Sequence, residues 1–369
     1  MRVALVHYWL VAERGGEKVL RVLCDMFPGA VIFTHVADRA LTERLYPGHE
    51  VRESFIARLP FARRAYRSYL PLMPLALEEL DLRGFDLVIS SESGPAKGVI
   101  PDPGAVHVCY CHSPMRYIWD HYRTYRESAG IVARLMMPFF AHRLRQWDVS
   151  AAARVDAFVA NSTFVAQRIR KYYRRESTVI HPPIDLDSFK EAPRERDPRF
   201  EGAYLWVGRL TAYKRPEIAV KGLIEMKRPL VVIGDGEATA SLKAMAGAGD
   251  VRFLGRADNE TLRRAYASCR ALVFPGEEDF GMTPVEAMAC GLPVIALKRG
   301  GALSTVIDGQ TGILFEDQSI AGFQAAVRRF ESIERDFDGE LLRRHAQSFS
   351  TQSFRRAFAD VLRLAGAAI

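Results

Sequence analysis

The segment ALVFPGEEDFGMTPVEAMACGLPVIAL, residues 271–297, begins and ends with a short apolar run and has a helical pattern between them. The runs at 271–274 and 292–297 predict buried strands. The pattern between them predicts a helix that Gly291 ends and that Pro293 prevents from resuming. Strand, helix and strand in this order are typical of a parallel sheet with crossover helices, so the segment favours an α/β fold.

The same alternation runs along the whole chain and predicts two sheets. Apolar runs in the first half occupy residues 2–8, 30–36, 85–91, 105–112 and 156–162, and runs in the second half occupy 203–209, 229–236, 251–256, 271–276, 292–297 and 312–316. Pro182 and Pro183 turn the chain between the two sets. We therefore expect one domain over residues 1–184 and another over 185–369. The last helical pattern, 351–366, has one apolar face to bury and is a candidate for crossing back to the first domain.

Composition favours a globular protein of 369 residues, 49% of them hydrophobic and 26% charged. Arg134 interrupts the longest apolar run, 131–141, so no membrane span is predicted. Five cysteines without metal-ligand spacing indicate free thiols in a reducing cytoplasm.

The net charge of +7 is unevenly distributed. Residues 1–185 carry 25 Lys and Arg against 19 Asp and Glu, and two stretches, 55–70 and 134–147, interleave arginine with aromatic residues. No nucleic-acid-binding motif accompanies them. An anionic membrane surface is one interpretation, and amphipathic helices with solvated arginines are the second.

Two carboxylates flank the start of the helix predicted in the opening segment. Thr283, Pro284 and Glu286 read as a capping box with proline at the first helical position, so Glu286 alone would be only a cap. Glu278 precedes the helix, in a loop that leaves the end of a strand. Open α/β sheets bind ligands at such loops, and the free N–H groups of a helix start favour an anion.

Other loops after predicted strands carry candidate residues. Gly15 and Gly16 open a helix and would allow close approach to a phosphate or sugar. In VGRLTAYKRP, 207–216, Gly208 is followed by Arg209, Lys214 and Arg215. These cations suit a diphosphate clamp, and a solvated loop is the less favoured alternative.

Weaker patterns complete the set. Gly234, in VIGDGE, is a fragment of a dinucleotide fingerprint. Asp185 and Asp187 resemble a metal-binding pair but are read as turn residues. His112 ends an apolar strand, next to Ser113 and in the same polar run as Arg116, either as a structural histidine or as part of a site.

Together these motifs resemble the family 4 retaining glycosyltransferases, which have the GT-B fold of two Rossmann-like domains facing across a cleft. EDFGMTPVE, 278–286, resembles the Glu-x7-Glu motif of the family. VGRL followed by Lys214 resembles its diphosphate-binding residues, and GGEKV (15–19), ANSTF (160–164) and PPIDLDSF (182–189) also fit. CHSPMRYIWD, 111–120, is similar to bacterial mannosyltransferases that build O-antigen and capsular or exopolysaccharide units, typically from GDP-mannose.

The resemblance implies a role for each motif. Glu278 would bond hydroxyls of the donor sugar, Glu286 would bond the ribose, and His112 would contact the sugar near the reacting carbon. Arg209 and Lys214 would neutralise the departing diphosphate in place of a metal ion. The remaining implied contacts are the backbone N–H groups of Phe280, Gly281, Met282 and Thr283 with sugar and phosphate, Gly15, Gly16 and Gly234 with the donor, Phe253 and Arg256 with the base, and Ser113 and Arg116 on the acceptor side.

The expected protein is thus a metal-independent hexosyltransferase that uses a nucleotide sugar, GDP-mannose by resemblance, and a lipid-linked oligosaccharide acceptor. It would act in surface polysaccharide synthesis, such as that of lipopolysaccharide, in the cytoplasm or as a peripheral protein at the inner face of the cell membrane. Neither a cofactor nor nucleic acid is expected. The alternatives are the same fold with a UDP-sugar or a soluble acceptor, and a non-catalytic subunit that binds a nucleotide sugar.

Overall fold

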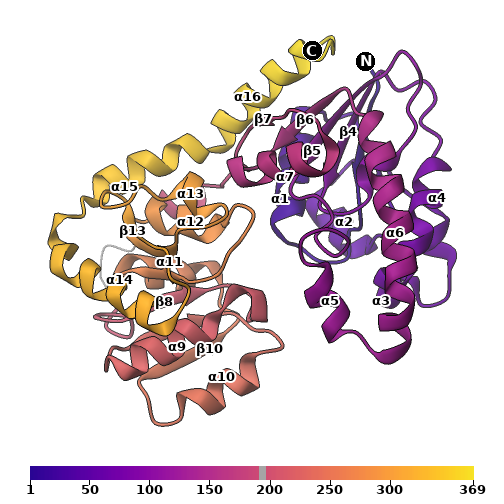
Figure 1. Cartoon of the computed structure of the whole chain (residues 1–369). Coiled ribbons are helices and arrows are strands. Elements are labelled where there is room, and N and C mark those ends of the chain that lie inside the picture. The colour runs from indigo at the N-terminus through magenta and orange to yellow at the C-terminus, as the bar shows by residue number, and fades with distance from the viewer. Residues whose placement is uncertain (191–196) are drawn as a thin grey trace. The chain divides into compact units, whose positions relative to one another are not determined.

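The computed structural model describes residues 1–190 and 197–369 and divides into two compact units. The first unit comprises residues 1–183 and 354–369, and the second comprises residues 184–353. Both are α/β units with a parallel sheet between helices (Figure 1). The predicted fold class is therefore confirmed.

The first unit contains a seven-stranded parallel sheet in the order β3-β2-β1-β4-β5-β6-β7. Its strands are β1 Val3–His7, β2 Val31–Thr34, β3 Val51–Glu53, β4 Leu87–Glu92, β5 Val106–Cys111, β6 Ala157–Ala160 and β7 Thr178–Val179. Its helices are α1 Gly15–Met26, α2 Arg39–Leu45, α3 Ala62–Ala65, α4 Met73–Glu78, α5 Tyr122–Ser128, α6 Ile131–Ala153 and α7 Thr163–Tyr173, with short 3-10 helices η1 Phe55–Arg58, η2 Tyr66–Leu72 and η3 Ala96–Gly98.

Helices cover both faces of this sheet, which is why its central strands are apolar throughout. Alternate residues of β1 enter different cores: Leu5 packs with α1, and Val6 packs with Leu77 of α4. The Leu5 core is completed by α16, Thr351–Leu364, whose apolar face buries Phe354 and Phe358. Their rings lie 5.5 and 6.1 Å from the ring of Tyr110 on β5.

The second unit contains a six-stranded parallel sheet in the order β10-β9-β8-β11-β12-β13. Its strands are β8 Tyr204–Val207, β9 Leu230–Ile233, β10 Val251–Gly255, β11 Leu272–Phe274, β12 Val294–Leu297 and β13 Gly312–Phe315. Its helices are α8 Asp187–Lys190, α9 Pro216–Glu225, α10 Thr239–Ala246, α11 Asn259–Ser268, α12 Met282–Ala289, α13 Ala302–Thr305, α14 Ile320–Ile333 and α15 Gly339–Ala346, with 3-10 helices η4 Ala212–Lys214, η5 Glu334–Asp336 and η6 Gln347–Phe349. Separate cores form on the two faces, one with α11, α12 and α15 and one with α9, α10 and α14.

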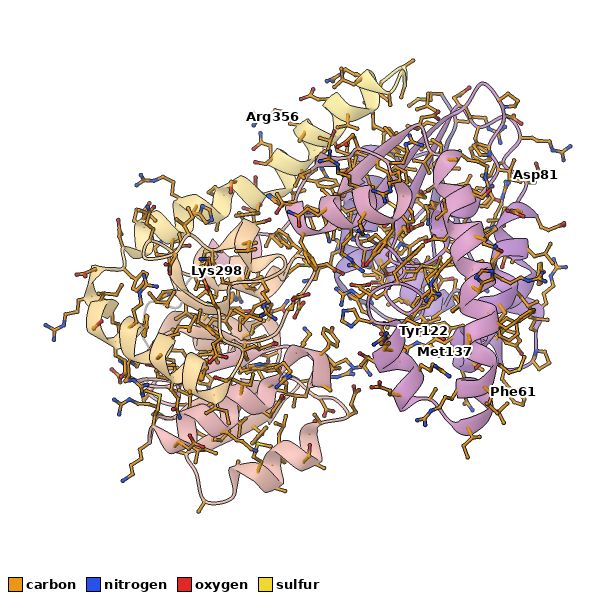
Figure 2. All side chains as sticks on the ribbon, in the orientation of Figure 1. Phe61, Asp81, Tyr122, Met137, Lys298 and Arg356 are labelled. Carbon is orange, nitrogen blue, oxygen red and sulfur yellow. The ribbon has the colours of Figure 1, made fainter. Side chains whose placement is uncertain are left out.

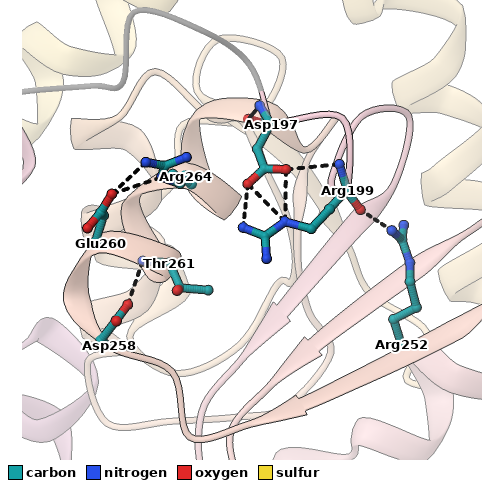
Figure 3. Close-up of polar contacts among 8 residues, drawn as sticks. Asp197, Arg199, Arg252, Asp258, Glu260, Thr261 and Arg264 are labelled. Carbon is teal, nitrogen blue, oxygen red and sulfur yellow. Dashed lines mark hydrogen bonds and ion pairs between the residues drawn. The ribbon is translucent and has the colours of Figure 1, made fainter.

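Polar contacts fix the chain at Asp197, ahead of β8 (Figure 3). The Asp197 carboxylate accepts hydrogen bonds from the backbone and guanidinium of Arg199, and its own N–H donates to Ser268 of α11 at 2.9 Å. Arg252 of β10 donates to the carbonyl oxygen of Arg199. This corner is therefore tied to both α11 and β10.

Within residues 1–190 and 197–369, no helix is long and apolar enough to cross a membrane. All five cysteines are free and buried.

Candidate functional site

The carboxyl edge of the second sheet contains a point where the strand order reverses. From β8 the chain proceeds outward through β9 and β10, and it then returns to the other side of β8 with β11, β12 and β13. The helices that follow β8 and β11, α9 and α12, therefore pack on opposite faces of the sheet. Ligands of open α/β sheets bind at such a switch point.

The loops at this switch point bring a cation and a carboxylate together. Lys214 ends η4 after β8, and Glu278 lies in the loop after β11. The Lys214 Nζ atom lies 2.8 Å from Glu278 Oε1, and the two side chains are only 15% and 20% exposed. Arg209 follows β8 directly and remains more exposed, with Nη2 3.6 Å from Glu237 Oε2. Lys214, predicted to bind the diphosphate, and Glu278, predicted to bind the sugar, are thus adjacent.

The start of α12 presents backbone rather than side chains beside Glu278. Phe280 is 4% exposed and its ring packs into the core, 5.8 Å from the ring of Phe349. Gly281 caps the helix with φ +81°, and a Cβ there would lie 2.9 Å from Phe274 Cζ. Met282 and Thr283 form the first turn. Free N–H groups at such a helix start attract an anion.

The predicted capping box is wrong. The helix begins at Met282 after Gly281, so Thr283 and Pro284 are already inside its first turn, and no side chain caps it. Glu286 instead accepts a hydrogen bond from the buried hydroxyl of Tyr266 at 3.2 Å and is itself 7% exposed. Gly281 takes the cap position because the packing of Phe274 leaves no room for a Cβ there.

Glycines allow the neighbouring loops to touch. A Cβ on Gly276 would lie 2.6 Å from Lys214 Cα, and a Cβ on Gly301 would overlap the backbone of Phe280. The Gly301 N–H also donates to the carbonyl oxygen of Glu278 at 2.8 Å. Gly276 thereby packs the Glu278 loop against Lys214, and Gly301 holds it from the other side.

The other residues of this unit that were predicted to bind the nucleotide-sugar donor lie further along the sheet. Gly234 follows β9 with φ +133°, and a Cβ there would overlap the carbonyl oxygen of Gly208. Its role in the structure is loop packing. Phe253 lies on β10, the edge strand, and packs partly against the core, while Arg256 follows β10 and is exposed. The strand order places β10 two strands from β8, so the sheet does not bring Phe253 to the Lys214–Glu278 pair.

The carboxyl edge of the first sheet holds His112 beside Gly16. His112 follows β5, and its Nε2 lies 2.9 Å from Ser91 Oγ at the end of β4. A Cβ on Gly16, in the first turn of α1 after Gly15, would lie 2.8 Å from the Tyr8 hydroxyl and 3.6 Å from His112 Nε2. Burial, with a smaller contribution from the neighbouring His7, lowers the pKa of His112 to about 3. The ring is therefore neutral at physiological pH.

The loop that follows His112 is fixed from several sides. The His112 N–H donates to the Glu92 carbonyl oxygen at 2.6 Å. The Ser113 hydroxyl is buried, donates to the Pro114 carbonyl oxygen at 2.8 Å and accepts from Arg168 at 2.8 Å. Ser113 therefore holds the loop, and its hydroxyl already acts as both donor and acceptor within it. Arg116 lies half-buried in the same loop.

A fully buried ionic cluster lies at the base of this loop. Lys97 Nζ lies 2.9 Å from Glu92 Oε1 and also bonds Asp148 of α6, and all three side chains have no exposed surface. Asp148 accepts further bonds from Trp119, in the loop, at 2.8 Å and from Tyr173, in α7, at 2.9 Å. The cluster thus links β4, α6, α7 and the His112 loop.

Sequence reasoning missed several of these residues. Lys97 and Asp148 are 51 residues apart and have no motif. Ser91 was not predicted because it lies within the mainly apolar run that forms β4. Gly300 and Gly301 could have been predicted from the sequence, because this glycine pair follows the strand β12 just as Gly15 and Gly16 follow β1.

No group of three or more potential metal-ligating side chains converges among the described residues. Metal independence stays a prediction. Asp187 begins α8, and Asp185 precedes it and accepts from the Ser188 N–H at 3.4 Å, as a turn residue does.

Two family models match the chain. The model described as Glycosyltransferase Family 4 matches residues 14–188, and the model described as Glycosyl transferases group 1 matches residues 187–348. Each half of the chain is thus similar to a glycosyltransferase domain. The matched ranges meet at residues 187–188, close to the boundary between the two units.

Curated proteins of similar sequence are also named as glycosyltransferases. A D-inositol 3-phosphate glycosyltransferase from Geodermatophilus obscurus is 30% identical over 231 residues, which cover 55% of this chain and 51% of the relative. The D-rhamnosyltransferase WbpZ of Pseudomonas aeruginosa is 31% identical over 191 residues, which cover 47% and 49%. The chain thus spans about half the length of the curated relatives that it matches.

Solved structures match the fold over nearly the full chain. Anabaena Alr3699/HepE in complex with UDP-glucose has a TM-score of 0.74 and 18% identity, with coverage of 98% of this chain and 99% of that one. The apo form of the lipopolysaccharide outer core galactosyltransferase WaaB has a TM-score of 0.68 and 19% identity, with coverage of 98% and 100%. The two parallel-sheet halves are those of the GT-B fold.

Proposed function

We propose that the protein is a retaining glycosyltransferase that moves a sugar from a nucleotide donor to a saccharide acceptor. The observation that carries the proposal is the Lys214–Glu278 pair, 2.8 Å apart at the switch point of the second sheet and beside the start of α12. An ammonium group suits a diphosphate, and a carboxylate suits sugar hydroxyls. The ion pair holds both side chains in place before a donor arrives.

Charge stabilisation is the proposed source of catalysis. Lys214 and Arg209 would neutralise the negative charge that develops on the leaving diphosphate, and the N–H groups at the start of α12 would add to this. The bond from the anomeric carbon to the phosphate oxygen breaks, and a bond to the acceptor oxygen forms on the same face. The acceptor hydroxyl gives its proton to the departing phosphate. Glu278 would hold the donor sugar in position for this step.

His112 would act as a neutral hydrogen-bonding group towards the donor sugar. Its pKa, lowered by burial to about 3, leaves the ring uncharged at neutral pH. The Ser91 hydroxyl, 2.9 Å from Nε2, fixes the orientation of the ring. A neutral ring can bond a hydroxyl without having to supply or remove a proton.

GDP-mannose is the proposed donor and a lipid-linked oligosaccharide at the inner face of the cell membrane is the proposed acceptor, both on the resemblance of residues 111–120. The relative WbpZ, named as a D-rhamnosyltransferase, supports sugar transfer in a similar chain without fixing this sugar. A UDP-sugar is the main competing donor, because the structural neighbour Alr3699/HepE is described with UDP-glucose. A soluble acceptor, or a non-catalytic role as a donor-binding subunit, would also be compatible with the fold.

The proposal is tested by thermal-shift titration with GDP, UDP, ADP and their sugar conjugates, without added metal. A ligand at a hundred times its Kd stabilises the folded state by about 2.7 kcal/mol, which a melting curve detects. Selective stabilisation by GDP and GDP-mannose would support the proposed donor, and selective response to UDP or ADP would overturn it while keeping nucleotide-sugar binding.

Lys214→Met tests the site itself, with Lys221→Met as the matched control because Lys221 is exposed on α9. Lys214→Met should lose the response to nucleotide, and Lys221→Met should keep it. Equal responses in both variants, or no response of the wild-type protein to any nucleotide, would refute the proposed site.

A further inference from the structure

The first half of α6 exposes an apolar face. Its large exposed side chains lie at helix positions one, two, five, six and nine, which share one side of a helix. They are Ile131 at 80% exposed, Val132 at 77%, Leu135 at 73%, Met136 at 45% and Phe139 at 55%. The second half of the same helix buries one face, through Ala141, Leu144 and Asp148 among others. A contiguous exposed apolar face of this kind marks an interaction site.

Residues 55–75 lie beside this helix and add further apolar groups. Leu70 of η2 packs against the buried cluster that contains Ala141 and Leu144 of α6, so the two segments lie close to one another. Phe61 is 80% exposed and Leu75 is 53% exposed. Figure 2 shows Phe61 and Met137 at the same end of the first unit, near the start of α6. We call residues 55–75 and 121–145 together the α6 surface.

Positive charge is concentrated on the α6 surface. Its two segments contain nine arginines and a single acidic residue, Glu127, whereas the whole chain has a net charge of +7. The arginines are placed among the apolar groups: the Arg143 guanidinium lies 5.1 Å from the Phe139 ring centroid. Arg134 donates to the carbonyl oxygens of Arg126 and Glu127, which ties α5 to the start of α6.

The combination of exposed apolar residues and arginines on the α6 surface fits an anionic bilayer better than a second copy of the chain or nucleic acid. A second copy of this surface would bring two sets of arginines together, and like charges oppose that contact. Nucleic acid would use the arginines but would leave the aliphatic face without a partner. An anionic bilayer satisfies both, because its phosphates pair with arginine and its acyl boundary accepts aliphatic and aromatic side chains.

We propose that the α6 surface binds the protein to an anionic lipid bilayer, with the face of Leu135 and Phe139 inserted at the acyl boundary and the arginines on the headgroups. This deepens the proposed function, on which it rests, because a lipid-linked acceptor lies in such a bilayer. Vesicle binding is measured without donor or acceptor, and nucleotide binding is measured without vesicles. Failure of one proposal is therefore distinguishable from failure of the other.

The experiment is flotation of the full chain with vesicles of phosphatidylcholine alone and with an equimolar mixture of phosphatidylcholine and phosphatidylglycerol. The wild-type protein should bind the mixed vesicles and release as salt is raised. Leu135→Glu should weaken binding by at least about tenfold, since it removes an apolar anchor and adds a repelled charge. The matched control is Leu364→Glu, because Leu364 is 88% exposed on α16 of the same unit.

A second variant, Arg63→Glu with Arg64→Glu, reverses two exposed charges without touching α6. It should weaken binding by at least about tenfold on the mixed vesicles. The proposal is overturned if the wild-type protein floats with neither vesicle, or if Leu135→Glu binds as well as Leu364→Glu. Sedimentation gives a further check: a wild-type dimer that Leu135→Glu converts to a monomer would assign the surface to a second copy instead.

Discussion

Replacing Lys97 by methionine would leave two carboxylates inside the first unit without their shared counter-charge. Lys97, Glu92 and Asp148 have no exposed surface, and the ammonium group bonds both acids. Asp148 would keep its bonds from Trp119 and Tyr173, whereas Glu92, among the residues that the structure describes, would keep only the backbone N–H of residue 97, at 2.7 Å. Glu92 is therefore the group that the substitution leaves least compensated.

The expected loss follows from the desolvation of Glu92. Breaking a buried ion pair by removing one partner costs about 3–5 kcal/mol. Protonation of the remaining acid limits that cost. Burial raises the pKa of Glu92 from 4.5 to about 7 although Lys97 opposes the rise. We expect the free energy of unfolding to fall by about 3 kcal/mol at pH 7.

The pH dependence distinguishes this cause from a simple packing defect. A raised folded-state pKa means that the stability present below pH 4.5 is lost as pH rises through the folded pKa. In the wild-type protein this loss ends near pH 7. Without Lys97 the pKa of Glu92 rises further, so the loss continues above pH 7. Above pH 7, the difference in the free energy of unfolding between the wild-type protein and Lys97→Met should therefore grow by up to about 1.4 kcal/mol per pH unit.

Urea unfolding followed by tryptophan fluorescence measures the effect, because Trp9, Trp119 and Trp147 lie in the first unit and only Trp206 lies in the second. The control is Lys298→Met, which removes an exposed ion pair with Glu316 and should leave the midpoint unchanged. A deficit below about 1 kcal/mol at pH 7, or one that narrows as pH rises, would refute the assigned role of the cluster.

Three further outcomes are expected. Glu278→Gln should lower sugar transfer by at least about a hundredfold with an unchanged melting curve, and transfer near the wild-type rate would remove Glu278 from the site. Gly301→Ala should lower the unfolding free energy of the second unit by about 1–3 kcal/mol, since its Cβ would overlap the Phe280 backbone; an unchanged urea midpoint would contradict this. Ser91→Ala should reduce transfer by about tenfold through loss of the His112 hydrogen bond, and a variant with full activity in a steady-state assay would show that His112 needs no such support.

The fold was predictable because strands buried on both faces are continuous apolar runs. β12 is such a run, and the sequence around it also showed where the preceding helix ends. β3 was not predicted, since it has three residues and two of them, Arg52 and Glu53, are exposed. A strand this short, with mostly exposed side chains, lacks the apolar pattern that identifies the central strands.

The site was only partly predictable. Glu278 and Lys214 were named from local motifs, and the structure places them in contact. The bond between Glu286 and Tyr266 joins α12 to α11, so no local pattern could show that Glu286 is not a cap. Ser113 looked available because the sequence does not show that Arg168, 55 residues later, occupies its hydroxyl.

The position of α16 has a consequence for synthesis on the ribosome. The first unit needs residues 354–362 to cover the β5 face that carries Tyr110, yet residues 184–353 are translated before them. The second unit therefore has all its strands while the first still exposes an apolar surface. During translation the second unit should therefore fold before the first is complete. The amino-terminal half of the chain should depend on chaperones longest.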